Sequence, residues 1–137
     1  MREFVLGASF ALHWCFEDGA TEETDFVLTA LQNQEAIAWV PGIWRYEVLN
    51  GLGKGVTRGR LGRDKALLFW REILELPIRT VDVPVDESLL ALALLHNLSI
   101  YDACYLSLAQ MRKLPLATSD AKLRQAVESS GFLVMQP

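Results

Sequence analysis

The chain has little cysteine, no long hydrophobic run and no excess of positive charge. Its 137 residues include two cysteines, Cys15 and Cys104, without the Cys-x-x-Cys or Cys/His spacing of a zinc site. The two could bridge, but buried thiols in a reducing cytosol are the simpler interpretation. Every apolar run is shorter than a membrane span, and the N-terminal residues do not form a secretory signal. We therefore expect a cytoplasmic protein without a membrane segment.

Short apolar segments alternate with longer segments of helical periodicity. Hydrophobic residues make up 51% of the chain, which is enough for one domain with a sizeable core. The pattern predicts strands at residues 3–6, 36–40, 78–83, 114–117 and 132–135. It predicts helices at residues 8–16, 21–34, 43–52, 60–76 (or from 62), 86–95, 99–111 and 119–130. We therefore expect a single α/β domain over residues 1–137, with a mostly parallel sheet of about five strands and helices on both faces.

Glycines and basic residues follow the third predicted helix. The glycines are Gly51, Gly53, Gly55 and Gly59. We expect them to end this helix in a glycine-rich linker. The basic residues in and after this linker are Lys54, Arg58, Arg60, Arg63 and Lys65. The net charge of −4 argues against a dedicated nucleic-acid binder, yet this segment forms a local basic cluster. Taken alone, such a cluster is better explained as a solvated helix start.

Three acidic residues lie where predicted strands lead into helices. Asp120 follows a strand, Asp102 lies in the first turn of a helix, and Glu47 lies about one turn inside another. Ligand sites in parallel α/β sheets lie beyond the carboxyl ends of the strands, where these side chains can meet. Carboxylates gathered in this way repel one another unless a divalent cation neutralises them, and Mg²⁺ or Mn²⁺ prefers such oxygen ligands. Each acid also has an ordinary explanation as a helix-capping or solvated helix residue.

Four segments resemble, in order, the sequence blocks of PIN-domain ribonucleases. Residues 4–9, F-V-L-G-A-S, are similar to the family's opening V-[VL]-D-A-S, and Glu47 matches its second acid. Residues 98–106, L-S-I-Y-D-A-C-Y-L, resemble the block L-[ST]-x-Y-D-A-x-Y-[LV]. Residues 116–123, L-A-T-S-D-A-K-L, resemble L-[AV]-T-x-D-x-x-L. The compact length further resembles the toxin half of bacterial VapBC toxin–antitoxin pairs.

The resemblance implies an endoribonuclease that uses Mg²⁺ or Mn²⁺. One or two ions held by the carboxylates would polarise the scissile phosphate and activate a water molecule. Asp102 would be a direct metal ligand, Asp120 a ligand directly or through water, and Glu47 a ligand or water orienter. The hydroxyl of Thr118 would position an outer water, and the basic cluster would hold RNA phosphates without reading sequence. The resemblance also implies a cognate antitoxin peptide and a homodimer.

Gly7 stands where the family has its first metal-binding aspartate. Glycine offers no side-chain oxygen, so we predict that this chain is inactive or severely impaired as a nuclease. A positive φ at this position would be a structural reason for the glycine. Otherwise the chain is a disarmed toxin, one base change from an Asp codon, or a degenerate member kept as a binding or scaffold module. A phosphatase or response-regulator-like protein also uses clustered acids, but this sequence lacks the phosphoacceptor and lysine that it would need.

Overall fold

The computed structural model describes residues 1–16 and 19–129, and its centre is a four-stranded parallel sheet. The strands are β1 (Arg2–Leu6), β2 (Ala36–Pro41), β3 (Ile78–Val81) and β4 (Leu116–Ala117). They lie in the order β3-β2-β1-β4, and every neighbouring pair is parallel. The predicted α/β fold with a parallel sheet is confirmed, with four strands in the described residues instead of about five. The fifth strand predicted at residues 132–135 lies outside the described residues.

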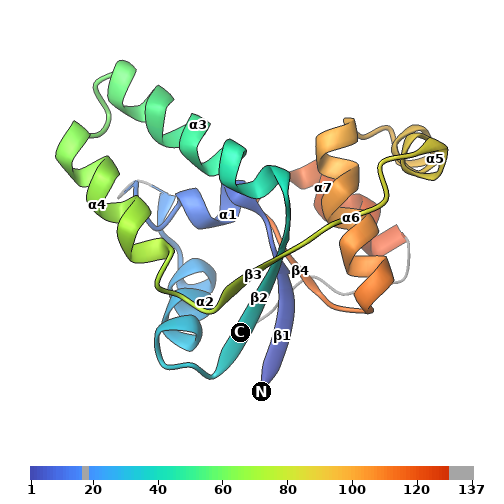
Figure 1. Ribbon diagram of the computed structural model, residues 1–137, viewed down its shortest axis with the longest axis horizontal. Helices are drawn as coiled ribbons and strands as arrows, with labels where there is room; N and C mark the ends of the chain where they lie inside the picture. The colour runs from blue at the N-terminus through green and yellow to red at the C-terminus, as the bar shows by residue number, and fades with distance from the viewer. Residues whose placement is uncertain (17–18, 130–137) are drawn as a thin grey trace.

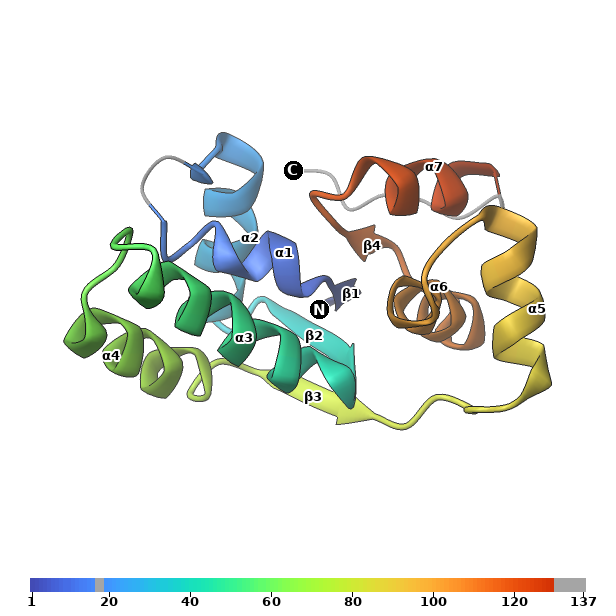
Figure 2. The same ribbon diagram turned by 90° about the horizontal axis from the view of Figure 1, so that it is seen from above.

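Helices cover both sides of the sheet, as predicted. One side carries α1 (Ala8–Leu12), α2 (Glu22–Gln32), α3 (Ile43–Thr57) and α4 (Arg63–Ile73). The other side carries α5 (Glu87–His96), α6 (Ile100–Arg112) and α7 (Ala121–Ser129). Figures 1 and 2 show the two groups of helices with the strands between them. The helix α6 packs against β1, β2 and β4, so it joins the sheet to the second group.

The strand β1 is the centre of the hydrophobic core. It pairs with β2 on one side and with β4 on the other. Its residues Phe4, Val5 and Leu6 are fully buried, as expected for a parallel strand covered on both faces. Leu106 and Leu108 of α6 are also fully buried. Because β1 is fixed from all sides, the residue that follows it, Gly7, has a well-defined position at the carboxyl end of the sheet.

The predicted glycine-rich linker is wrong, because α3 continues through Gly51, Gly53 and Gly55 to Thr57. The reason is the close approach of α3 to α1. A Cβ added to Gly51 would lie 2.4 Å from Cδ1 of Leu12, and one added to Gly55 would lie 2.7 Å from Cζ of Phe16. Gly51 and Gly55 therefore leave space on α3 for the side chains of Leu12 and Phe16. The helix α1 is also shorter than predicted, because it ends at Leu12.

The helices α5 and α6 form the most apolar pair in the second group. In the described part of the chain, no single helix is both long and apolar enough to cross a membrane. Together α5 and α6 pass that test in length and composition, but they are bent by 102° at the break between them. Both cysteines are free thiols; Cys104 is buried and Cys15 is half-buried, in line with the simpler interpretation of the sequence.

Candidate active site

A small cavity of about 80 Å³ lies at the carboxyl end of the sheet. It is lined by Gly7, Ala8, Ser9, Glu47, Asp102, Tyr105, Thr118, Asp120 and Leu123. We call it the acid cavity. Its carboxylates come from three places: Glu47 from α3, Asp102 from α6, and Asp120 from the turn between β4 and α7. The structure thus brings the three acids and Thr118 together beside Gly7.

Of the capping box predicted for Ser99 and Asp102, the structure shows the bond to the Ser99 side chain, and Asp120 caps the start of α7. Ser99 is the N-cap of α6, and its hydroxyl oxygen accepts a hydrogen bond from the Asp102 N–H at 3.0 Å. Asp120 begins α7, where its Oδ1 accepts a hydrogen bond from the Leu123 N–H at 2.8 Å. The Thr118 hydroxyl oxygen accepts from the Asp120 N–H at 3.1 Å. These bonds fix the backbone of both acids, and Asp120 keeps a second carboxylate oxygen for another partner.

Glu47 is held by a residue that the sequence analysis did not single out. The hydroxyl of Tyr105 donates a hydrogen bond to Oε1 of Glu47 at 2.5 Å. Tyr105 lies three residues after Asp102 on α6, so both side chains lie on the same face of that helix. This spacing was the available signal in the sequence. Ser9, which also lines the acid cavity, carried no comparable signal.

Burial and mutual repulsion perturb the carboxyl groups. Burial raises the pKa of Asp102, and the nearby charge of Asp120 raises it further. Burial also raises the pKa of Glu47; the Tyr105 hydrogen bond lowers it and the charge of Asp102 raises it. Burial and the contact with Glu47 keep the pKa of the Tyr105 phenol above its usual range, so its proton stays in place. Carboxylates that face one another at a cavity are typical of a functional site and favour a cation.

The backbone at Gly7 does not require glycine. Gly7 is the N-cap of α1 with φ −72° and ψ 144°, an extended conformation that any residue adopts. A positive φ is therefore excluded as the reason for the glycine. A Cβ at this position would lie 3.0 Å from the carbonyl oxygen of Ala117 and 3.6 Å from Cα of Thr118. A side chain here would need a shift of a few tenths of an ångström in its neighbours, and it would start at the wall of the acid cavity.

The acid cavity suits a hard divalent cation in the chemistry of its donors. Its side chains offer carboxylate and hydroxyl oxygens, which Mg²⁺ and Mn²⁺ prefer. Its donor set is nevertheless incomplete. Among residues 1–16 and 19–129, no three His, Cys, Asp or Glu side chains come close enough to one another to hold a metal ion. The position that could add a fourth carboxylate is occupied by Gly7.

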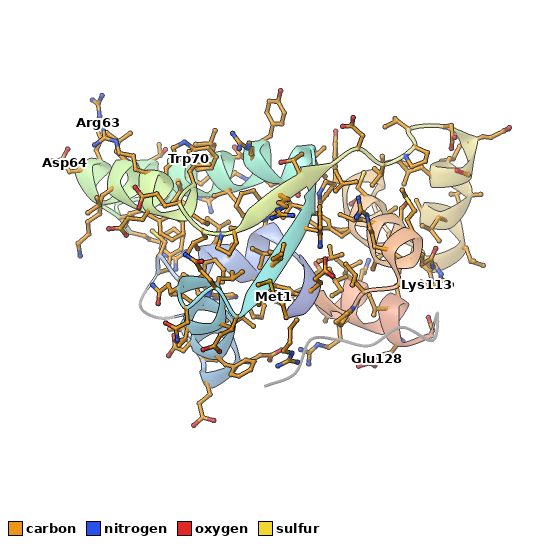
Figure 3. All side chains as sticks on the ribbon, turned by 60° about the horizontal axis from the view of Figure 1, so that its bottom comes forward. Met1, Arg63, Asp64, Trp70, Lys113 and Glu128 are labelled. Carbon is orange, nitrogen blue, oxygen red and sulfur yellow. The ribbon has the colours of Figure 1, made fainter. Side chains whose placement is uncertain are left out.

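The five basic residues of the predicted cluster separate in the structure. Lys54, Arg58 and Arg60 line a cavity of about 410 Å³, which we call the basic groove. Arg63 lines a different, mostly apolar cavity between α3 and α4. Figure 3 places Arg63 and Asp64 at the outer end of the molecule, far from Lys113 at the end of α6. Lys65 is exposed and lies near the thiol of Cys15. Burial raises the pKa of this thiol, and the positive charge of Lys65 lowers it by a smaller amount.

The basic groove adjoins the acid cavity. Ser9 lines both, so the two hollows meet at the first turn of α1. A third cavity of about 400 Å³ shares Thr118 with the acid cavity and His13 with the basic groove. In the basic groove, the guanidinium of Arg60 lies over the ring of Phe16, 4.6 Å from its centre. The arrangement can therefore accept a ligand that extends from a positively charged surface to the carboxylates.

The fold and the position of the acids define a class, a parallel α/β domain with an acidic pocket at the carboxyl edge of its sheet. A family model described as PIN domain matches residues 5–128, so this chain belongs to the PIN-domain family. A curated relative, Ribonuclease VapC3 of Pyrobaculum aerophilum, is 36% identical over 84 residues. That alignment covers 58% of this chain and 63% of the relative's length.

Three solved structures share the fold. PAE2754 from Pyrobaculum aerophilum has a TM-score of 0.72 at 22% identity, covering 91% of this chain and 79% of that one. VapC20 (Rv2549c) of Mycobacterium tuberculosis, described as a Sarcin-Ricin loop cleaving toxin, has a TM-score of 0.69 at 14% identity, with 98% and 99% covered. VapBC2 from Rickettsia felis, bound to a DNA fragment from its promoter, has a TM-score of 0.66 at 14% identity, with 98% and 97% covered. The family model thus confirms the PIN-domain family predicted from the sequence, and the three structures show the shared fold.

Proposed function

We propose that this chain has the scaffold of a VapC-like toxin, a metal-dependent endoribonuclease, and that its metal site is disabled by Gly7. The observation that carries the proposal is the acid cavity itself. Three carboxylates from widely separated parts of the sequence line one cavity at the carboxyl edge of the sheet, beside position 7. Repulsion among these charges has no structural benefit that the fold needs, so a cation is the natural partner.

In an intact site of this kind, Asp102 and Asp120 would hold Mg²⁺ or Mn²⁺, and Glu47 would act as a ligand or orient a water molecule. The bound ion supplies two effects: it polarises a phosphate oxygen and lowers the pKa of an attacking water. The hydroxyl of Thr118, which is buried beside Asp120, would orient an outer water. With Gly7 in place of an acid, the remaining carboxylates hold the ion more weakly, and we expect little or no cleavage.

We propose that RNA phosphates lie along the basic groove and reach the acid cavity at Ser9. Lys54, Arg58 and Arg60 supply positive charge that attracts a phosphate backbone irrespective of its sequence. The stack of exposed Arg60 on half-buried Phe16 is suited to a flexible, single-stranded segment, whose bases can contact aromatic and guanidinium planes. Arg63 and Lys65, which were part of the predicted RNA-binding set, lie outside this groove and would contribute less.

The proposed partners are a cognate antitoxin peptide and a second copy of the chain, in the cytoplasm. The cavity between α3 and α4, about 340 Å³, is lined by Leu49, Leu52, Val56, Ala66, Leu67 and Trp70, among others. Such an apolar groove suits an amphipathic helix of the antitoxin. The name VapBC2 denotes a toxin with its antitoxin in the Rickettsia relative.

The homodimer would use a different surface. Exposed leucines on α5, such as Leu94 and Leu95, offer an apolar surface for a second copy of the chain.

The proposal is tested by restoring the missing acid. The Gly7→Asp variant should cleave RNA in the presence of Mg²⁺ or Mn²⁺, and EDTA should stop it. The Gly7→Asn variant is the matched control, since it has nearly the same shape and no charge. The unaltered chain and Gly7→Asn should cleave at least about 100-fold more slowly, in line with the loss of a metal ligand. A folded Gly7→Asp protein that neither binds metal nor cleaves RNA would contradict the proposal.

The alternative is a binding or scaffold module that has no need of a metal. The backbone conformation gives no structural reason for the glycine, so its presence is compatible with a disarmed toxin and equally with this alternative. In that case Gly7→Asp would fold but would gain neither Mn²⁺ affinity nor cleavage, while partner binding would be unchanged. Measuring Mn²⁺ affinity and RNA cleavage of the Gly7→Asp variant therefore separates the two candidate functions.

A further inference from the structure

The geometry points to Tyr105 as a positioning residue that holds Glu47 at the acid cavity and connects it to the start of α1. The Tyr105 side chain is 2% exposed, and its hydroxyl donates to Oε1 of Glu47 at 2.5 Å. The two residues are 58 positions apart in the sequence. A buried hydroxyl requires a hydrogen-bond partner, and a bond to a charged carboxylate is stronger than one to a neutral group.

The same phenol oxygen has a second neighbour at the start of α1. The backbone N–H of Ala8 lies near it and lowers the pKa of the phenol, against the larger effects of burial and Glu47 that raise it. The first N–H groups of a helix have no acceptor within that helix, and the N-cap residue Gly7 offers no side-chain acceptor. The oxygen of Tyr105 therefore lies where three helices meet at the acid cavity: α1 with Ala8, α3 with Glu47, and α6, which carries Tyr105 itself.

Glu47 needs such a restraint. Its side chain has three torsion angles and is only half-buried, and the charge of Asp102 repels it. Without a fixed partner, the carboxylate would turn toward water and away from the other acids. The bond to Tyr105 uses Oε1 and leaves Oε2 for a cation or a water molecule. In this proposal Tyr105 acts through Glu47.

This role rests on the proposed function, in which Glu47 serves a metal site. We would test it in the Gly7→Asp protein by measuring Mn²⁺ affinity, well below the unfolding temperature of every variant. Tyr105→Phe keeps the ring and removes only the hydroxyl. The matched control is Tyr101→Phe, on the same helix, where the side chain is 62% exposed. We expect Tyr105→Phe to weaken Mn²⁺ binding about tenfold or more, as for other residues that orient metal ligands, and Tyr101→Phe to leave it unchanged.

A second background separates positioning from general structural damage. In Gly7→Asp/Glu47→Gln, the carboxylate that Tyr105 is proposed to orient is gone, so Tyr105→Phe should cause no further loss of Mn²⁺ affinity. The proposal would be overturned if Tyr105→Phe reduced Mn²⁺ affinity equally in both backgrounds. It would also be overturned if Tyr105→Phe left the affinity of the Gly7→Asp protein unchanged.

If Gly7→Asp itself neither binds Mn²⁺ nor cleaves RNA, the proposed function fails, and the contact is judged by thermal unfolding in the unaltered chain. Non-additive shifts in Tm for Tyr105→Phe and Glu47→Gln would then support the positioning contact without the metal. Additive shifts would overturn it.

Discussion

The backbone N–H of Gly7 donates a hydrogen bond to the carbonyl oxygen of Ala117 at 2.8 Å, and a Cβ on residue 7 would lie 3.0 Å from that same oxygen. The end of β1 is therefore held against the end of β4 at the point where a side chain would enter the acid cavity. The contact is tight but involves a single atom, and the backbone of residue 7 is already in an extended conformation. A side chain can be added here if β4 moves slightly.

The first prediction concerns the stability of variants at position 7. Gly7→Ala should lie within about 1 kcal/mol of the unaltered chain, because the lost freedom of the unfolded chain offsets the close contact with Ala117. Without metal, Gly7→Asp should be less stable than Gly7→Asn, since it adds a fourth charge to the cavity. Saturating Mn²⁺ should reverse that order, because a ligand that binds only the folded state stabilises it. Urea unfolding in EDTA and again in Mn²⁺ measures the free energy of unfolding of each variant under the two conditions. A loss of several kcal/mol in Gly7→Ala would show that β4 cannot adjust.

The second prediction concerns pH. Burial, followed by the charge of Asp120, raises the pKa of Asp102 in the folded protein. Between its unfolded and folded pKa values, the folded state then binds more protons, so this group lowers stability as the pH rises through that interval. The penalty is fully present above the folded pKa and vanishes below the unfolded value of about 4. In EDTA, Asp102→Asn should therefore raise Tm at pH 7, and the gain should shrink as the pH approaches 4.

The control for this experiment is Asp64, an exposed acid in the first turn of α4. Asp64→Asn relieves no repulsion in the cavity and removes a favourable interaction with the helix dipole, so it should not raise Tm at pH 7. A gain for Asp102→Asn that is the same at pH 4.5 and pH 7 would contradict the electrostatic explanation.

The third prediction compares two glycines in α3. Gly53 is exposed, and a Cβ there would meet nothing within 4 Å. Gly53→Ala should therefore stabilise the protein by about 0.5–1 kcal/mol through helix propensity. Gly51→Ala should destabilise it by about 1–3 kcal/mol, because its Cβ would lie 2.4 Å from Cδ1 of Leu12 and force that side chain out of its place. Thermal unfolding measures the stability of the two variants. A stabilisation by Gly51→Ala equal to that by Gly53→Ala would show that Leu12 can move aside freely.

The fourth prediction concerns RNA binding in the unaltered chain, which is suited to the measurement because we expect it not to cleave. Arg58→Glu, in the basic groove, should weaken binding of a short single-stranded RNA about tenfold and reduce the salt dependence of its affinity. Arg63→Glu makes the same charge change outside the groove and should have a much smaller effect. Fluorescence anisotropy at several salt concentrations measures both. Equal losses would mean that net charge matters and the groove does not.

Much of the fold and the position of the acids followed from the sequence. The alternation of strands and helices predicted a parallel α/β sheet, and each acid lies just after a strand or within the first turns of a helix, so the topology brings the acids together. The continuation of α3 through its glycines was not predictable, because it depends on the distance between α3 and α1, which tertiary packing sets. The separation of Arg63 from Lys54 has the same origin, since the turn before α4 directs the two residues to different surfaces.

The bond between Tyr105 and Glu47 illustrates another limit. Helical spacing places Tyr105 and Asp102 on one face of α6, but nothing local indicates which residue of α3 that face meets. The contact depends on how far α3 extends over the end of the sheet. Pairings between helices on opposite sides of a sheet are set by packing and have no sequence period of their own.

The two walls of the acid cavity differ in how firmly they are anchored. Glu47 and Asp102 lie on helices of 15 and 13 residues, whereas Thr118 and Asp120 follow β4, which pairs with β1 through two residues, Leu116 and Ala117. Such a short ladder opens at lower free energy than the centre of the sheet. We therefore expect the β4–α7 side of the acid cavity to open locally before the side formed by Glu47 and Asp102, so a ligand too large for the closed cavity would enter by displacing Thr118 and Asp120 while the core around β1 stays closed.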